Sequence, residues 1–283
     1  MKKPILLAVL FLALASFACS IQNIQMNTTE TRQVDIMEPL PENSEETKIE
    51  FQMTGGKFTI TPAESGLVTG TIIYNIEGWE PEFTRSSNLY EITQVNPFRI
   101  SGIPTDDVVN NWDLSLSTQI PLDVSIEGGA SENDFDFTGM QLTNLRIVQG
   151  ASDSTIRFDA PNPIEMEEFV FTTGASSAEL YGLAHANFSE MAVSCGAGDY
   201  TFEFGGALTS DSRMDVKAGV SNISIIIPSD LNAVINNQGT VSNINTRGTW
   251  LVTDNTYTTQ MEGPTLIINL DMAVGNVNLV HEE

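Results

Sequence analysis

Residues 124–130 read VSIEGGA, and the pattern returns as LRIVQGA at 145–151, FVFTTGA at 169–175 and MAVSCGA at 191–197. Each copy ends in Gly-Ala, and its glycine is preceded, at five and three residues, by apolar side chains. The same alignment takes in six glycines, separated by 21, 24, 22, 23 and 56 residues: Gly129, Gly150, Gly174, Gly196, Gly219 and Gly275. All twelve aligned positions are apolar and the residues between them are mainly polar, as expected for strands with one buried face.

A second apolar pair follows each of four glycines at six and eight residues. These pairs are Phe135 and Phe137, Ile156 and Phe158, Phe202 and Phe204, and Ile225 and Ile227. After Gly174 the same positions hold Leu180 and then Gly182. We call the repeating unit of strand, glycine turn, strand and bend a rung. A single rung cannot bury its apolar face, whereas stacked rungs form a continuous core in which each buried side chain contributes roughly 1.5 to 3 kcal/mol.

The repeat therefore predicts an all-β fold, a single-stranded β-solenoid or β-helix-like stack of about 22-residue rungs. Residues 101–283 are expected to form this repeat body, with a long rung or a protruding hairpin at 228–264. The six aligned glycines are expected at structural turns, where the backbone needs either a positive φ or a close approach to the next rung. A phosphate cradle is not expected, because it would require a following helix and a lysine, and neither appears.

The N-terminus is typical of an exported protein. Lys2 and Lys3 precede an apolar run of about fourteen residues, which is shorter than the roughly 20 residues of a membrane span, so residues 1–18 are predicted to be a signal peptide. The run ends in Ser16-Phe17-Ala18-Cys19, which resembles the lipobox of bacterial lipoproteins. This predicts a lipidated Cys19 and an extracytoplasmic protein anchored to the bacterial cell membrane. The alternative is ordinary cleavage after Ala18, which would give a secreted protein.

Two segments separate this start from the repeat body. Residues 19–47 comprise Cys19 and a polar, acidic stretch without an apolar period, which predicts a disordered tether. From Ile49 the side chains alternate between apolar and polar, so residues 48–100 are predicted to be an N-terminal β segment.

The composition limits the partners of the chain. Without Lys2 and Lys3 there are ten basic against 37 acidic residues, a balance that repels nucleic acid and makes it an unexpected partner. The acidic residues are scattered, as on a solvated exterior. Cys19 and Cys195 are the two cysteines, so no disulfide framework exists. If Cys19 were not lipidated, a bridge between the two would become testable.

Further motifs resemble a known family, the toast-rack proteins of the bacterial envelope. They are the Gly-Ala turns, Trp112-Asp113-Leu114-Ser115-Leu116, Phe137-Thr138-Gly139-Met140, Pro161-Asn162-Pro163, Gly182-Leu183-Ala184-His185-Ala186-Asn187-Phe188, Gly275-Asn276-Val277-Asn278-Leu279 and the opening segment 67–75. The resemblance covers residues 48–281 and extends to the C-terminal part of LiaF-type cell-wall stress regulators. It implies no catalytic residue and no cofactor.

An enzymatic reading has few residues to rest on. His281 lies two residues from the end of the sequence, so a histidine-based site would depend on His185, which is expected to be a bend residue. Cys195 is expected to be a small, partly buried filler beside Thr173 and Ala218. Three carboxylates, Asp134, Asp153 and Asp199, follow turn glycines at three to five residues and are expected to stack along one edge. Their expected role is turn hydrogen bonding; a calcium site there would lack the Gly-Gly-x-Gly-x-Asp repeat.

These observations leave three functional hypotheses. The leading one is a non-enzymatic envelope lipoprotein that presents a rigid β-solenoid to another protein or to the cell wall. The second, implied by the resemblance, is an accessory of an envelope-stress sensing system. The third is a carbohydrate-active β-helix enzyme, for which a groove with two exposed carboxylates would be the distinguishing observation.

Overall fold

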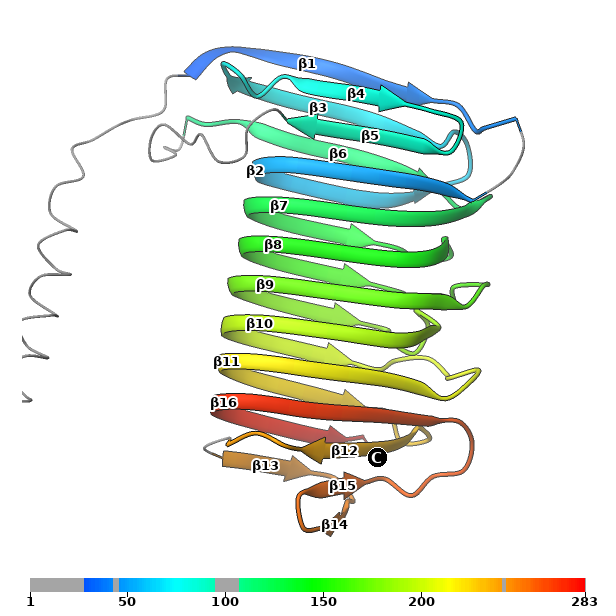
Figure 1. Cartoon of the computed structure of the whole chain (residues 1–283), viewed down its shortest axis with the longest axis vertical. Coiled ribbons are helices and arrows are strands. Elements are labelled where there is room, and N and C mark those ends of the chain that lie inside the picture. Colours follow the sequence, from blue (N-terminus) through cyan, green and yellow to red (C-terminus); the bar gives the residue numbers. More distant parts are fainter. Residues whose placement is uncertain (1–27, 43–45, 95–106, 241–242, 283) are drawn as a thin grey trace, which may run out of the picture.

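Seven strands of 16 or 17 residues form the middle of the molecule and pair in parallel, one above the other (Figure 1). The computed structural model describes residues 28–42, 46–94, 107–240 and 243–282, so the predicted signal peptide and Cys19 lie outside the described residues. In stacking order the strands are β2 (Thr47–Ala63), β7 (Pro121–Asp136), β8 (Gln141–Arg157), β9 (Met166–Tyr181), β10 (Phe188–Glu203), β11 (Ser212–Ile227) and β16 (Thr265–His281). The described chain is all-β, with 16 strands in one sheet.

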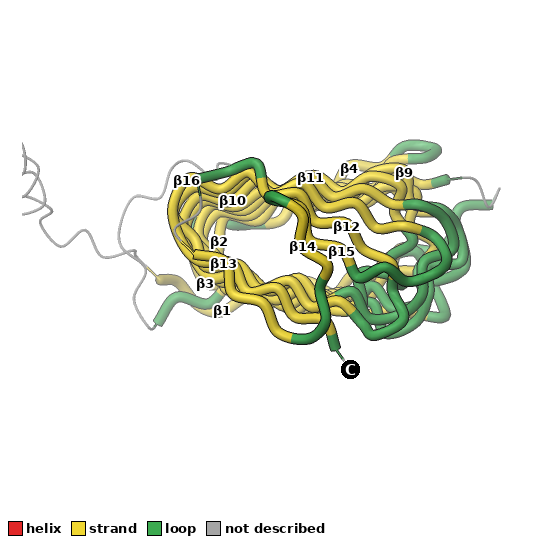
Figure 2. Tube along the Cα trace, turned by 90° about the horizontal axis from the view of Figure 1, so that it is seen from below, coloured by secondary structure: helices red, strands yellow, loops and turns green. Residues whose placement is uncertain are grey.

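Each long strand bends back on itself, so that its two halves form opposite walls of a flattened stack (Figure 2). The prediction was two strands joined at a glycine turn, but the structure shows one continuous strand through the bend. Register is kept on both sides of the glycine, with Cys195 opposite Ala218 before it and Ala197 opposite Val220 after it. The strand continues because parallel pairing with the neighbouring rungs resumes directly after the bend.

The glycines of the bend are needed for close approach between rungs. A Cβ on Gly196 would lie 2.4 Å from the carbonyl oxygen of Gly174, and one on Gly219 would lie 2.4 Å from that of Gly196. Gly129, Gly150 and Gly174 meet the same obstacle at 2.2 to 2.8 Å, and none of these five has a positive φ. Of the two reasons expected for glycine here, the structure therefore supports crowding against the preceding rung.

The sixth glycine is placed differently from its prediction. Gly275 pairs with Ser221 and not with Gly219, whose place in the last rung is taken by Ala273, between the paired residues Met272 and Val274. The apolar residues aligned with it move accordingly, so Leu270 lies beside Val216. The predicted register of the last rung was wrong by two residues. Side chains of a strand point to the same face at every second residue, so a shift of two leaves the same side chains buried.

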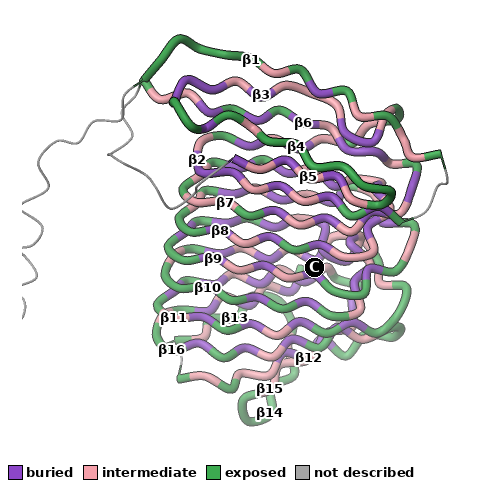
Figure 3. Tube along the Cα trace, turned by 45° about the horizontal axis from the view of Figure 1, so that its top comes forward, coloured by how far each residue is buried: buried purple, intermediate pink, exposed green. Residues whose placement is uncertain are grey.

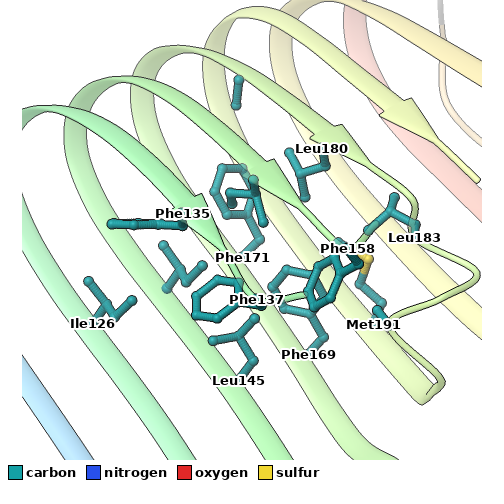
Figure 4. Packing of buried hydrophobic residues seen from close by; sticks show 14 of the residues in the cluster. Ile126, Phe135, Phe137, Leu145, Phe158, Phe169, Phe171, Leu180, Leu183 and Met191 are labelled. Carbon is teal, nitrogen blue, oxygen red and sulfur yellow. The ribbon is translucent and has the colours of Figure 1, made fainter. Parts of the chain in front are cut away.

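Apolar columns run through the interior between the two walls (Figure 4). The column of Phe171, Val193 and Val216 is continuous from rung to rung, as is that of Leu145, Phe169 and Met191. These pairings confirm the predicted columns for the rungs from β7 to β11. Aromatic rings link successive layers, with ring centroids 5.3 to 6.1 Å apart along the series Phe58, Phe135, Phe137, Phe158 and Phe169. Buried residues alternate with exposed or partly exposed ones along most of each long strand, and the alternation is interrupted near the bend (Figure 3).

The N-terminal end of the stack is closed by shorter strands. These are β1 (Thr28–Glu38), β3 (Val68–Ile76), β4 (Pro81–Arg85), β5 (Leu89–Gln94) and β6 (Asn110–Ser117). On one wall β5 pairs with β2 and β4 with β5; on the other, β6 pairs with β2, β3 with β6 and β1 with β3.

Two predictions about this end are wrong. The sequence predicts a disordered tether at 19–47, but residues 28–38 form β1, in which Val34 and Ile36 supply apolar contact for pairing with β3. The division between 48–100 and 101–283 also fails, because β2 pairs with β7 over almost its whole length. In β2 the place of the bend glycine is held by Thr54, which hid this rung from the glycine alignment.

At the C-terminal end the chain leaves and returns. After β11 it forms β12 (Asn232–Asn237) and β13 (Asn243–Arg247), which together make an interrupted rung, and then a small hairpin of β14 (Leu251–Thr253) and β15 (Thr256–Thr258). The last strand, β16, then inserts between β11 and the pair β12 and β13. Both expectations for residues 228–264, a long rung and a hairpin, thus describe part of the segment.

Candidate interaction surfaces

Both histidines lie in loop or terminal contacts. His185 is in the turn after β9, with its Nδ1 atom 2.9 Å from the carbonyl oxygen of Phe158. His281 ends β16, with Nδ1 2.9 Å from the carbonyl oxygen of Thr249 and its ring 5.7 Å from that of Trp250. The expected bend role of His185 is confirmed by its turn position.

Cys195 is buried in the bend column between Thr173 and Ala218, as expected for a small filler. Burial raises the pKa of its thiol to about 12, and because the thiolate is the reactive form, the side chain is a poor nucleophile at neutral pH.

We expect native protein to resist alkylation of Cys195 by iodoacetamide at pH 8. Unfolding in guanidinium chloride removes the burial that raises the thiol pKa, so labelling should then become stoichiometric. Mass spectrometry of the peptide that contains Cys195 measures this directly. Rapid alkylation of the folded protein would show that the bend column is open to solvent.

The three candidate carboxylates divide between two columns of one wall. Asp153 and Asp199 share a column, separated by Ser177 of the rung between them. Asp134 belongs to the neighbouring column and accepts a hydrogen bond from Arg157 Nη2 at 2.5 Å. The expected stacking along one edge therefore applies to two of the three.

A hollow of about 250 Å³ opens on this wall between the two columns. It is lined by Lys57, Thr59, Glu132, Asn133, Asp134, Asp153 and Thr155. Lys57 Nζ lies 2.8 Å from Glu132 Oε2, so both Glu132 and Asp134 are already paired with basic side chains. Paired carboxylates are poorly suited to the separate acid and base roles that glycoside hydrolysis requires, and the hollow is better suited to polar contact.

Amide side chains, which the sequence reasoning missed, connect the rungs on both walls. Asn276 Nδ2 donates to Asn222 Oδ1 at 2.9 Å, and Asn222 Nδ2 donates to Asp199 Oδ1 at 2.8 Å. On the other wall Asn236 donates to Asn269 and Asn269 to Asp215. Hydrogen bonds from Arg213 and Asn269 hold the pKa of Asp215 below its usual value. Recurrence of polar residues three positions after Gly196 and Gly219 would have revealed Asp199 and Asn222, whereas Asn276 stands three positions after Ala273, which the glycine alignment did not include.

The bend itself presents a narrow uncharged surface. The position after the bend glycine, or after Ala273 in the last rung, holds an exposed small or apolar residue. In successive rungs these residues are Ala130, Ala151, Ala175, Ala197, Val220 and Val274. The two valines are 62% and 50% exposed. The molecule thus offers two polar walls joined by an apolar ridge.

Among the described residues, no cluster of histidine, cysteine and carboxylate side chains has a geometry that could hold a metal ion. In the same residues, no helix is long and apolar enough to cross a membrane.

Comparison with known proteins gives one family and a set of similar folds. The sequence model of the N-terminal domain of toast_rack, DUF2154, matches residues 22–164. A search of curated proteins finds no match. A solved structure named a "putative cell adhesion protein", from Clostridium sporogenes, is 18% identical and has a TM-score of 0.52, with 89% of this chain and 100% of that chain covered.

Two further solved structures are each named a "putative adhesin". The one from Bacteroides fragilis is 9% identical with a TM-score of 0.38, covering 90% of this chain and 100% of that one. The one from Parabacteroides merdae is 10% identical with a TM-score of 0.37, covering 91% and 98%.

Proposed function

Because this chain belongs to the family of the N-terminal domain of toast_rack, DUF2154, we propose that it is a non-catalytic interaction module of the bacterial cell envelope. In this proposal the stack is a β-solenoid with rungs of about 22 residues, each of which contains one bent strand and the loop that leads to the next. Its partner is another protein or the cell wall, and no cofactor takes part.

The observation that supports this proposal is the regular arrangement of the two walls. From β2 to β16 the strands pair in register, so each exposed column is a straight row with neighbours about 4.8 Å apart. Since each rung contacts only its neighbours, a solenoid offers long surfaces that do not depend on loop conformation. Four of the candidate catalytic side chains, those of His185, Cys195, Asp134 and Asp199, take part in structural contacts.

The proposed place of action follows from the N-terminal sequence. A signal peptide at 1–18 and a lipidated Cys19 would hold the module on the outer side of the membrane. The excess of acidic residues suits a soluble body that does not bind anionic lipid headgroups itself. The likeness to the Clostridium sporogenes structure shows the fold, and the adhesion role in that protein's name is in keeping with the proposal.

The anchor is tested by replacing Cys19. In cells that express Cys19→Ala, we expect the protein to move from the membrane fraction to the soluble fraction, because the acyl chains that hold it are absent. Immunoblotting of fractionated cells measures this, and an unchanged membrane fraction would reject the lipid anchor.

The interaction role is tested by crosslinking in intact cells, followed by mass spectrometry of the captured molecules. Reversed charges distinguish the walls: Asp153→Lys with Asp199→Lys alters one wall, and Glu168→Lys with Glu190→Lys alters the other. We expect a specific partner that one pair of substitutions releases and the other pair retains. Capture of nothing beyond what an unfolded variant captures would reject the proposed function.

A further inference from the structure

The two ends of the stack differ in how their outermost strands are protected. Within the described residues, the strands that pair on one side only are β1, β4, β13 and β14. The last three are short, with five, five and three residues, and β4 begins at Pro81. Short strands and prolines are the usual protection against pairing with another chain. β1 has 11 residues and is therefore the exception.

From Arg32 to Glu38 the free edge of β1 has few of the usual devices that prevent strand addition, because the register irregularity in its pairing with β3 lies earlier, between Thr28 and Arg32. It contains no proline, glycine or lysine, and its pairing with β3 is regular from Arg32 to Glu38. Val34 and Ile36 face the rest of the molecule, while Met37 is 86% exposed beside the free edge. Alternate backbone N–H and C=O groups of such an edge point away from the sheet and can bond an added strand.

The charges around this edge indicate what kind of strand would fit. The two basic side chains near β1 already form ion pairs, Arg32 with Glu80 and Arg85 with Glu38. Glu30 and Asp35 remain exposed on β1. The chain as a whole has a formal net charge of −25, which opposes close approach of a second copy.

We propose that β1 is a docking edge, at which an extended, positively charged segment of a partner protein adds as a further strand. This inference rests on the proposed interaction role and adds to the two walls a second contact surface, at the N-terminal end of the stack, with the chemistry of the segment that it would bind. Main-chain hydrogen bonds to β1 would give affinity, and basic side chains opposite Asp35 and Glu30 would give specificity.

The test uses a ten-residue peptide of alternating lysine and valine, with a glutamate and valine peptide as its charge-reversed control. When each peptide is added to the full-length protein, the lysine peptide should bind at least about tenfold more tightly than the glutamate peptide, because the edge is acidic. Hydrogen exchange should slow at alternate residues of β1. The substitution Asp35→Lys should weaken binding of the lysine peptide and strengthen binding of the glutamate peptide.

A pair of proline substitutions separates edge binding from folding. In an antiparallel ladder adjacent residues alternate, so of Gln33 and Val34 one N–H points to β3 and the other points to the free edge. Of the variants Gln33→Pro and Val34→Pro, one should lower Tm, and the other should lose peptide binding with Tm unchanged. Wild-type binding by both variants would overturn the proposal.

Other outcomes are equally decisive. If sedimentation showed a dimer of the wild-type protein, and either proline variant were a monomer, the edge would be assigned to a second copy and the basic partner would be rejected. Absence of peptide binding, with partner capture in cells retained, would reject the docking edge and leave the proposed function standing. Peptide binding without any capture in cells would reject the proposed function.

Discussion

Val193→Asp is expected to unfold the stack. Val193 is 2% exposed and lies in an apolar column between Phe171 of β9 and Val216 of β11. An aspartate there has no basic partner, so it must either bury a charge or be protonated at a cost in free energy. Buried unpaired charges are among the few substitutions that exceed about 4 kcal/mol, a large part of a typical domain stability. Thermal denaturation followed by circular dichroism measures the loss.

The adjacent residue provides the control. Ser194 is exposed and faces Lys217 across the ladder, so Ser194→Asp should leave Tm nearly unchanged. Retention of the wild-type Tm by Val193→Asp would mean that the register of β10 is wrong by one residue, because such a shift exchanges buried and exposed faces.

Gly196→Ala is expected to destabilise the protein, although replacing glycine by alanine in a strand ordinarily stabilises it through the unfolded state. The added methyl group would meet the carbonyl oxygen of Gly174 at 2.4 Å. Backbone atoms cannot move aside as a flexible side chain can, so rungs β9 and β10 must separate. We expect a loss of about 1 to 3 kcal/mol, measured by urea denaturation.

Ala197→Val is the matched control for this substitution. It adds more atoms at the next residue, but Val220 occupies the same column with its side chain 62% exposed, so the column accepts valine. Its stability should stay within about 0.5 kcal/mol of wild type. Equal losses in both variants would show that the bend tolerates no added volume and that the glycine row has no special role.

The sequence was sufficient for the columns because burial imposes a period on every rung. Phe171, Val193 and Val216 could be aligned without a structure, since each stands three residues before a glycine that the neighbouring backbone requires. The repeat of two that makes strands recognisable also allowed the error at Gly275, because a shift of two residues preserves every buried face.

Other features depend on contacts that no local pattern encodes. β1 was assigned to a tether because its polar composition is that of an exposed strand, and only pairing with β3 makes it ordered. Thr54 replaces glycine in β2, so the first rung did not join the alignment. The asparagine series escaped notice because a hydrogen bond between neighbouring rungs depends on register, which the sequence only suggested.

The insertion of β16 has a consequence for the order of folding. Rungs from β7 to β11 can form in sequence, each adding to the one before across a loop closure of some 20 residues, which favours rapid local growth. β16 is different, because its two neighbours, β11 and β12, adjoin each other in the chain and must leave space for a strand that follows both. We therefore expect its addition to be a late, non-local step. A slow final kinetic phase, sensitive to substitutions at the interface of β12 and β16, is the behaviour that this topology predicts.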